Sequence, residues 1–346
     1  MNEPEPITLA PASPPSPHLS APTGQDGLPT ADRPRLPAWA RLLIYVPVVL
    51  VVGLIGNTVG SIPGVLVAMS TTRTDPGKLM TDPDAVARLT AAIPPWGIVL
   101  LMYTTFVPIV VITLLFARLL DRRSWDAIGL AVRPTTRRDV LWGVALAATV
   151  VGQVAIYFAL RLINLHRSED SIVASLLYGL VLFAGVGFWE ELIFRGYLLP
   201  NLAEITGKFW AIVISSVLFW SIHVTTPEAR DPVTAFGLVM MGVLFSLCYF
   251  GTGSLWLGIV LHGTYDFLLV SLFQPHSQMD LPTIFTTDVL APAWLVGPPG
   301  KAGLLDLLYL AGLMAVVYFG VYRRDPTASS EQRIGRSTAE TSSAAE

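Results

Sequence analysis

The feature that most constrains the fold of this chain is a series of eight apolar segments, most of them about 20 residues long. A helix rises about 1.5 Å per residue, so about 20 apolar residues cross the hydrocarbon core of a bilayer. Backbone polar groups inside lipid must be paired within the segment, which leaves helices as the available structure. The sequence therefore predicts an all-α, polytopic membrane protein with about eight transmembrane helices, at residues 42–69, 94–117, 140–163, 172–199, 209–224, 233–250, 255–273 and 304–322.

Composition supports a lipid bilayer as the environment. The chain is 53% hydrophobic and 14% charged, whereas an average soluble domain carries about 25% charged residues. The formal net charge of −3 gives no reason to expect a nucleic-acid partner. The single cysteine, Cys248, excludes an intramolecular disulfide.

The two ends of the chain differ from the apolar middle. Residues 1–38 are rich in Pro, Ser and Ala, and residues 325–346 are small and polar. Such segments lack the apolar surface needed to fold, so both are predicted to be disordered tails. The membrane domain is expected to occupy residues 39–324.

Basic residues predict the orientation of this domain. Short loops rich in Lys and Arg stay in the cytoplasm. With eight spans, three arginine clusters fall on one side, which predicts a protein of the cell membrane with both termini in the cytoplasm. These clusters are Arg33, Arg35 and Arg41; Arg118, Arg122, Arg123, Arg133, Arg137 and Arg138; and Arg323 and Arg324.

Two adjacent carboxylates and an arginine interrupt the apolar segment 172–199. Ionisable side chains at this depth cost roughly 2.5–3.5 kcal/mol each, so they are rarely present without a partner or a task. Glu191 and Arg195 are one helical turn apart and can form an ion pair on one face. Glu190 points about 100° away from Glu191, so it has no local partner.

Two further apolar segments carry histidine. His223 lies at the end of segment 209–224, and His262 and Asp266 share one face of segment 255–273. Counting the helical rise places Glu190, His223 and His262 where they can share one polar cavity, which we expect to open to the cytoplasm. The alternatives without chemistry are a buried ion cluster, a hydrogen-bonded core histidine and an interhelical polar bridge.

Together these residues resemble the signature of a known family of intramembrane proteases. The CPBP family, also called Abi, comprises CAAX proteases and bacteriocin-processing proteins. The flanking motifs Phe194-Arg195-Gly196 and Gly253-Ser254-Leu255-Trp256 add to the resemblance, which covers about residues 172–273. Its three parts are Glu190-Glu191-x-x-x-Arg195, Phe219-x-x-x-His223 and His262-x-x-x-Asp266.

The resemblance implies a CAAX-protease-like helical bundle that hydrolyses a peptide or membrane-protein substrate near the cytoplasmic face. It implies that Glu190 is the general base, that His223 helps to hold the water, and that His262 and Asp266 lie where the oxyanion is stabilised. Glu191 and Arg195 complete the implied site as a structural pair.

Position 266 departs from the best-understood eukaryotic relatives, which have Asn there. An ionised Asp266 cannot donate a hydrogen bond to an oxyanion, so it must be protonated, orient His262 or bind a metal. Glu190, His223, His262 and Asp266 are also a credible ligand set for zinc. The sequence leaves both a glutamate-type and a metal-dependent protease open.

The sequence also allows two functions other than proteolysis. The same fold could serve as a non-catalytic membrane scaffold or bacteriocin-immunity-type protein that binds a membrane partner protein. A proton-coupled transporter is less favoured, because the sequence has no inverted repeat and no pair of broken helices.

Overall fold

The computed structural model describes residues 34, 36–273, 281–298 and 300–324. The two predicted tails therefore lie outside the described residues, apart from residue 34 and residues 36–38. The described chain is built almost entirely of helices, which confirms the prediction of an all-α polytopic membrane protein.

Six helical stretches among the described residues are long and apolar enough to cross a membrane. The first three are α1 (Ala38–Thr72), α3 (Pro95–Leu115) with its π-helical extension η3 (Phe116–Leu120), and α5 (Thr136–Ala159). The fourth is a 50-residue stretch made of α6 (Ile172–Glu191), the π-helical turn η4 (Leu192–Leu198) and α7 (Leu199–Ser221). The last two are α8 (Pro232–Thr252) and α9 (Trp256–Phe273).

The six stretches contain seven of the eight predicted segments, and a shorter helix contains the eighth. The 50-residue stretch is interrupted at Gly207, whose φ of 78° and ψ of 164° are not helical. That backbone conformation is essentially restricted to glycine, because a side chain there clashes with the backbone. The interruption separates the predicted segments 172–199 and 209–224. The eighth segment is α10 (Leu304–Gly320), an apolar helix of 17 residues.

The remaining elements are short and connect the long helices. They are η2 (Pro76–Met80), α2 (Pro83–Ala91), α4 (Trp125–Ile128), η5 (Glu228–Arg230) and η6 (Tyr322–Arg324). Strands β1 (Ile163–Arg167) and β2 (Phe285–Val289) pair antiparallel, with Ile163 opposite Val289. The apolar pattern did not predict this two-stranded sheet, because it lies in loops between helices.

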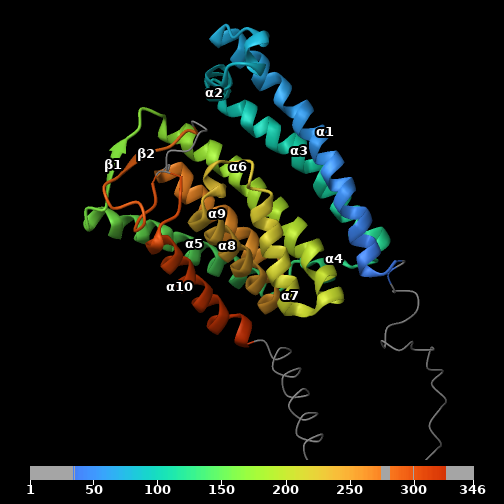
Figure 1. Cartoon of the computed structure of the whole chain (residues 1–346). Coiled ribbons are helices and arrows are strands. Elements are labelled where there is room, and N and C mark those ends of the chain that lie inside the picture. The colour runs from blue at the N-terminus through green and yellow to red at the C-terminus, as the bar shows by residue number, and fades with distance from the viewer. Residues whose placement is uncertain (1–33, 35, 274–280, 299, 325–346) are drawn as a thin grey trace, which may run out of the picture.

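Figure 1 shows how these elements are arranged. Helices α1 and α3 lie side by side along one flank of the bundle, and α10 lies on another flank. Helices α5, α6, α7, α8 and α9 form the centre, and the β1–β2 sheet lies at one end.

The bundle has two ends that matter for the site. At the first, which we call the arginine-rich end, Arg41 pairs with Asp121 at 2.8 Å and Arg123 with Glu204 at 2.9 Å. Leu255, just before α9, donates its backbone N–H to the carbonyl of Gly129 at the same end. Arg41 and Arg123, from two of the three arginine clusters that the sequence singled out, therefore lie at this end.

The second end, which we call the sheet end, holds β1, β2 and residues 281–298 and 300–303. Helix α5 ends just before β1, and Phe273 at the end of α9 stacks on Phe285 of β2. Lys301 lies 3.7 Å from Asp231, which caps the N-terminus of α8. Helices α5 and α9 thus run from the arginine-rich end to the sheet end, and α8 and α10 begin at the sheet end.

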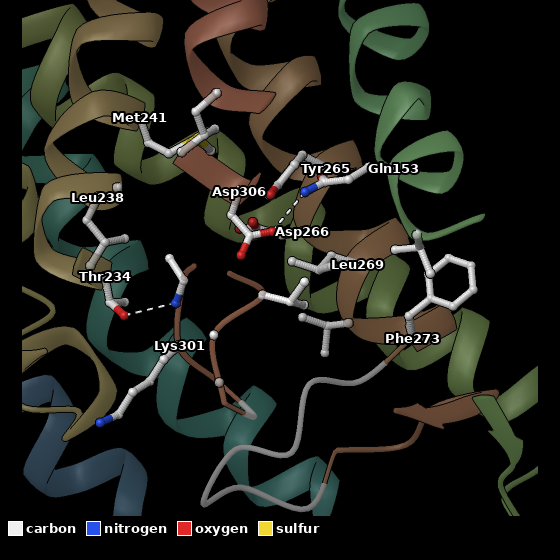
Figure 2. Close-up of a pocket in the computed structure, with 18 of the residues that line it drawn as sticks. Gln153, Thr234, Leu238, Met241, Tyr265, Asp266, Leu269, Phe273, Lys301 and Asp306 are labelled. Atoms are coloured by element: carbon white, nitrogen blue, oxygen red, sulfur yellow. Dashed lines mark hydrogen bonds between the residues drawn. The ribbon is translucent and has the colours of Figure 1, made fainter. Parts of the chain in front are cut away.

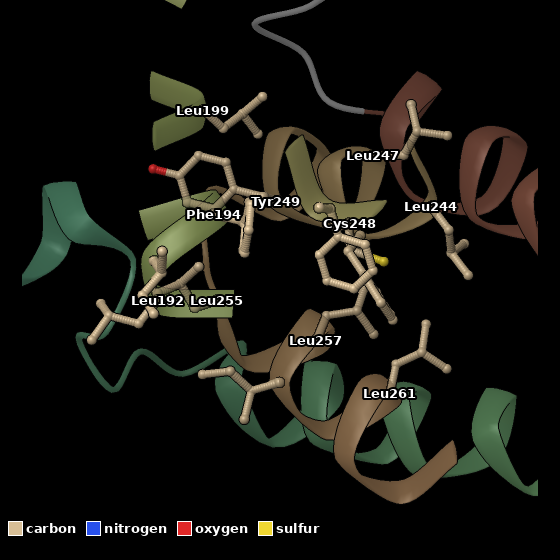
Figure 3. Packing of buried hydrophobic residues seen from close by; sticks show 14 of the residues in the cluster. Leu192, Phe194, Leu199, Leu244, Leu247, Cys248, Tyr249, Leu255, Leu257 and Leu261 are labelled. Carbon is tan, nitrogen blue, oxygen red and sulfur yellow. The ribbon is translucent and has the colours of Figure 1, made fainter. Parts of the chain in front are cut away.

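An apolar core fills the bundle toward the arginine-rich end. Figure 3 shows side chains of η4, α8 and α9 meeting in this core. Leu244, Phe245, Cys248 and Leu192 are fully buried there. The core fixes η4 and α9, which carry Arg195, His262 and Asp266 of the candidate site.

Candidate functional site

The ion pair that the sequence predicted between Glu191 and Arg195 is present. Arg195 Nη1 donates to Glu191 Oε1 at 2.9 Å, and both side chains are at most 1% exposed. Arg195 Nη2 donates to the carbonyl oxygen of Gly242 on α8, also at 2.9 Å. The guanidinium lies over the rings of Phe219 and Phe245, 4.7 and 5.1 Å from their centroids. Arg195 therefore ties η4 to α7 and α8 with both its charge and its planar face.

His262 joins the ion pair to the rest of the site. Its Nδ1 lies 3.1 Å from Glu191 Oε1, across 71 residues of sequence. Because a carboxylate oxygen accepts hydrogen bonds, this contact places the Nδ1 proton on His262. The imidazole also stacks on Phe245, with a centroid distance of 4.6 Å and an interplanar angle of 17°. Glu191 and Phe245 together fix the position and orientation of the ring.

The second nitrogen of His262 faces two carboxylates. Its Nε2 lies 3.3 Å from Asp266 Oδ2 and 3.9 Å from Glu190 Oε2. With a protonated imidazole, the charges of Glu191, Arg195, His262 and Asp266 sum to zero. Glu190 is then the one carboxyl group of the site without a compensating charge.

Glu190 is also the carboxyl group without a full set of hydrogen bonds. Its side chain is 8% exposed, and its Oε2 is buried with no hydrogen-bond partner among the described residues. Leaving a buried acceptor unpaired costs about 1–3 kcal/mol, more when it is charged. An unpaired buried acceptor persists at this depth only where the packing around it holds it there. The Oε2 atom of Glu190 can therefore accept a hydrogen bond from a water or from a substrate.

His223 reaches the site from the end of α7. Its Nδ1 lies 2.8 Å from the carbonyl oxygen of Phe219, one turn back in the same helix. A carbonyl oxygen is an acceptor, so the Nδ1 carries the proton and neutral His223 presents Nε2 as a lone pair. The rings of His223 and His262 both pack against Phe219, with centroid distances of 5.2 and 5.9 Å, so His223 lies on the same side of the site as His262.

Two glycines allow α6 and α9 to come close enough for these contacts. A Cβ added to Gly187 would lie 2.7 Å from the backbone nitrogen of Gly263 and from the carbonyl oxygen of Ile259. A Cβ on Gly263 would lie 2.7 Å from the carbonyl oxygen of Phe183. The sequence predicted that Gly185 and Gly187 are close-packing positions. Gly187 fills this role against α9, and a Cβ on Gly185 would meet the ring of Trp189 at 2.5 Å.

A cavity of about 480 Å³ adjoins the site. His223, His262 and Asp266 form part of its wall, whereas Glu190 lies behind them, outside the lining. The remaining wall is mainly apolar and comes from the sheet-end halves of α5, α8, α9 and α10 and from residues 296–298 and 300–302. Figure 2 shows Asp266, Leu269 and Phe273 of α9 on one side of this cavity and Thr234, Leu238 and Met241 of α8 on another.

The position of the cavity corrects one expectation. We expected it to open on the side of the arginine clusters. Its lining instead includes Thr287, Val289 and Lys301, which belong to the sheet end. The expectation was wrong because helical rise gives the depth of a residue but not the end at which helices diverge.

The comparison with protein families agrees with these residues. The family model for Rce1-like proteins, described as type II CAAX prenyl endopeptidase Rce1-like, matches residues 172–268. This segment belongs to the CAAX-protease family. The match confirms the resemblance of the sequence motifs, and it contains Glu190, Glu191, Arg195, His223, His262 and Asp266. Neither the curated proteins nor the solved structures include a match to the chain.

The matched segment also contains the four side chains that the sequence offered as zinc ligands. In the part of the chain that the structure describes, no group of three or more His, Cys, Asp or Glu side chains is arranged to hold a metal ion. His262 Nε2 lies 3.3 Å from Asp266 Oδ2, a distance at which a protonated imidazole donates a hydrogen bond to the carboxylate. Zinc therefore remains an expectation from the sequence.

Several contacts of the candidate site were not predicted from the sequence. Phe245, the carbonyl of Gly242 and Gly263 come from helices whose sequence is apolar and carries no local signal. Another is a polar group at the far side of the cavity, where Asp306 accepts hydrogen bonds from Gln153 and Tyr157 at 2.8 and 2.9 Å. The sequence signal that could have predicted this group is the presence of two polar residues, Gln153 and Asp306, within apolar segments.

Proposed function

We propose that this protein is an intramembrane endopeptidase of the CAAX-protease type that hydrolyses a peptide bond with a water activated by Glu190. The observation that supports this proposal most directly is the unpaired, buried Oε2 of Glu190, 3.9 Å from His262 Nε2. A carboxylate that is desolvated and not neutralised by a partner is a stronger base than one in water.

The reaction follows from the roles that the geometry allows. Glu190 takes a proton from water, and the hydroxide adds to the scissile carbonyl carbon. Neutral His223 accepts a hydrogen bond from the same water through Nε2. The proton then passes from Glu190 to the amide nitrogen, the C–N bond breaks, and an acid and an amine are released.

His262 is the group suited to the developing oxyanion. Glu191 holds its Nδ1 and Phe245 holds its ring plane, so a protonated His262 presents a fixed Nε2–H. A preorganised donor of this kind lowers the barrier without reorganising during the reaction. Asp266, 3.3 Å from Nε2, then orients His262 and stabilises its protonated form. It does not itself donate a hydrogen bond to the oxyanion. Glu191 and Arg195 act as positioning residues.

The test is hydrolysis of quenched-fluorescence apolar peptides by the purified chain in liposomes. Glu190→Gln keeps the side-chain volume and removes the base, so we expect turnover to fall about 10²–10⁴-fold. Glu169→Gln, an exposed position at the sheet end, is the matched control and should keep full turnover. Undiminished turnover of Glu190→Gln would refute the proposal.

The same variant separates proteolysis from a scaffold role. If Glu190→Gln fully restores a deletion strain, the biological role is that of a scaffold. The zinc interpretation stays a prediction, and metal analysis of active protein together with activity after chelation would test it.

A further inference from the structure

The arginine clusters and the cavity lie at opposite ends of the bundle. Residues 118–138 alone carry six arginines, and Arg41 and Arg323 lie at the same end. A Cβ on Gly251, near the end of α8, would lie 2.8 Å from Tyr322, so the end of α10 is also at the arginine-rich end. Residues of β2 and residues 296–298 and 300–302 line the cavity at the other end of the bundle.

Basic residues are fewer and more scattered at the sheet end. Among the described residues there, the loop of residues 73–94 has three basic residues in 22 positions, and the other loops contribute Arg161, Arg167, Arg230 and Lys301. The bias of Lys and Arg in short loops sets the orientation of a membrane protein, and acidic residues contribute little. The arginine-rich end therefore belongs in the cytoplasm.

From these two observations we infer that the catalytic cavity opens to the extracytoplasmic side of the membrane. The substrate class follows from this orientation and rests on the proposed protease function. The substrate is a polypeptide that reaches the outer face, namely an exported peptide or the outer end of a membrane protein. A protein lipidated and anchored on the cytoplasmic face is excluded, because its cleavage site lies across the bilayer.

The chemistry of the cavity fits such a polypeptide. Its volume of about 480 Å³ lies within the roughly 300–1,000 Å³ of ligand pockets. Apolar side chains such as Leu238, Met241 and Leu269 line it between the site and the sheet end. An apolar peptide segment entering from the outer face can bury its side chains there while its backbone reaches His262.

Cysteine labelling in intact cells tests the orientation without relying on activity. The only native cysteine, Cys248, is fully buried, so the natural chain should not react with the maleimide. Asn164→Cys places an exposed thiol on β1 at the sheet end, and Thr135→Cys places one at the arginine-rich end. Lys301→Cys places a thiol in the cavity wall. Asp288→Cys, opposite Asn164 in the sheet, replaces the first variant if that one does not fold.

A membrane-impermeant maleimide should label Asn164→Cys and Lys301→Cys as strongly in intact cells as in permeabilised ones. Thr135→Cys should be labelled only after permeabilisation. Labelling of Thr135→Cys in intact cells overturns the inference, as does labelling of the other two only after permeabilisation. A chain without peptidase activity would still give a clear labelling pattern, so the two proposals fail separately.

The substrate class is tested by comparing peptides released into the medium by cells with the natural chain and with Glu190→Gln. We expect Glu190-dependent fragments that come from exported peptides or from the outer ends of membrane proteins. Fragments from cytoplasmic ends would overturn the inference. The absence of any such fragments would count against the proposed proteolysis, while the labelling would still decide the orientation.

Discussion

The contact between α6 and α9 at Gly187 offers the sharpest test of how the site is assembled. In Gly187→Ala, the new Cβ would lie 2.7 Å from backbone atoms of α9, about 0.7 Å closer than an ordinary contact of 3.4 Å. The three atoms nearest to the new Cβ are backbone atoms of Ile259 and Gly263, so no side chain can rotate away. The helices themselves have to separate by about that distance.

The separation acts directly on the hydrogen bond between Glu191 and His262. That bond is 3.1 Å long, and an added 0.7 Å takes it beyond hydrogen-bond range. Overpacking of this kind costs about 1–3 kcal/mol of stability. A misplacement of about 1 Å in a catalytic site costs up to about 10²-fold in rate. We therefore expect Gly187→Ala to melt at lower temperature and to lose about 10–100-fold in turnover.

The assay compares thermal unfolding in detergent with peptide hydrolysis in liposomes. Gly152→Ala is the control, because a Cβ at this position of α5 meets nothing within 4 Å. It should be neutral or slightly stabilising, since alanine favours a helix over glycine by about 1 kcal/mol. If Gly187→Ala kept both the stability and the turnover of the natural chain, the reasoning from close helix contact would be refuted.

Three further variants test the fold around the site. Glu191→Gln leaves the buried guanidinium of Arg195 without its carboxylate, so unfolding in detergent should show a loss of about 3–5 kcal/mol; an unchanged melting temperature would contradict this. Gly207→Ala should cost about 1–3 kcal/mol from backbone strain alone, because nothing lies within 4 Å of the new Cβ; equal stability to Gly152→Ala would argue against the strain. Asp231 caps α8, and hydrogen bonds from the backbone of Thr234 lower the pKa of its carboxyl. Asp231→Ala should therefore cost about 0.5–2 kcal/mol at neutral pH. A lowered pKa stabilises the fold above the unfolded value of about 3.9, so the difference from the natural chain should shrink as the pH falls below about 4, and a difference independent of pH would contradict the capping role.

The sequence by itself determined the features that depend on local helix geometry. Eight apolar segments gave the spans, because the thickness of the bilayer sets the length of a helix. The pairs Glu191–Arg195 and His262–Asp266 were predictable, because residues four apart in a helix are neighbours whatever surrounds them.

Only the tertiary structure decided how the helices are rotated and where they diverge. The bond between Glu191 and His262 joins two helices, and its existence depends on the close approach at Gly187 and Gly263. The stacking of Phe245 on His262 likewise requires α8 at a particular rotation. The end at which the cavity opens follows from the divergence of α5, α8, α9 and α10 near the sheet, and no periodicity within one helix encodes that divergence.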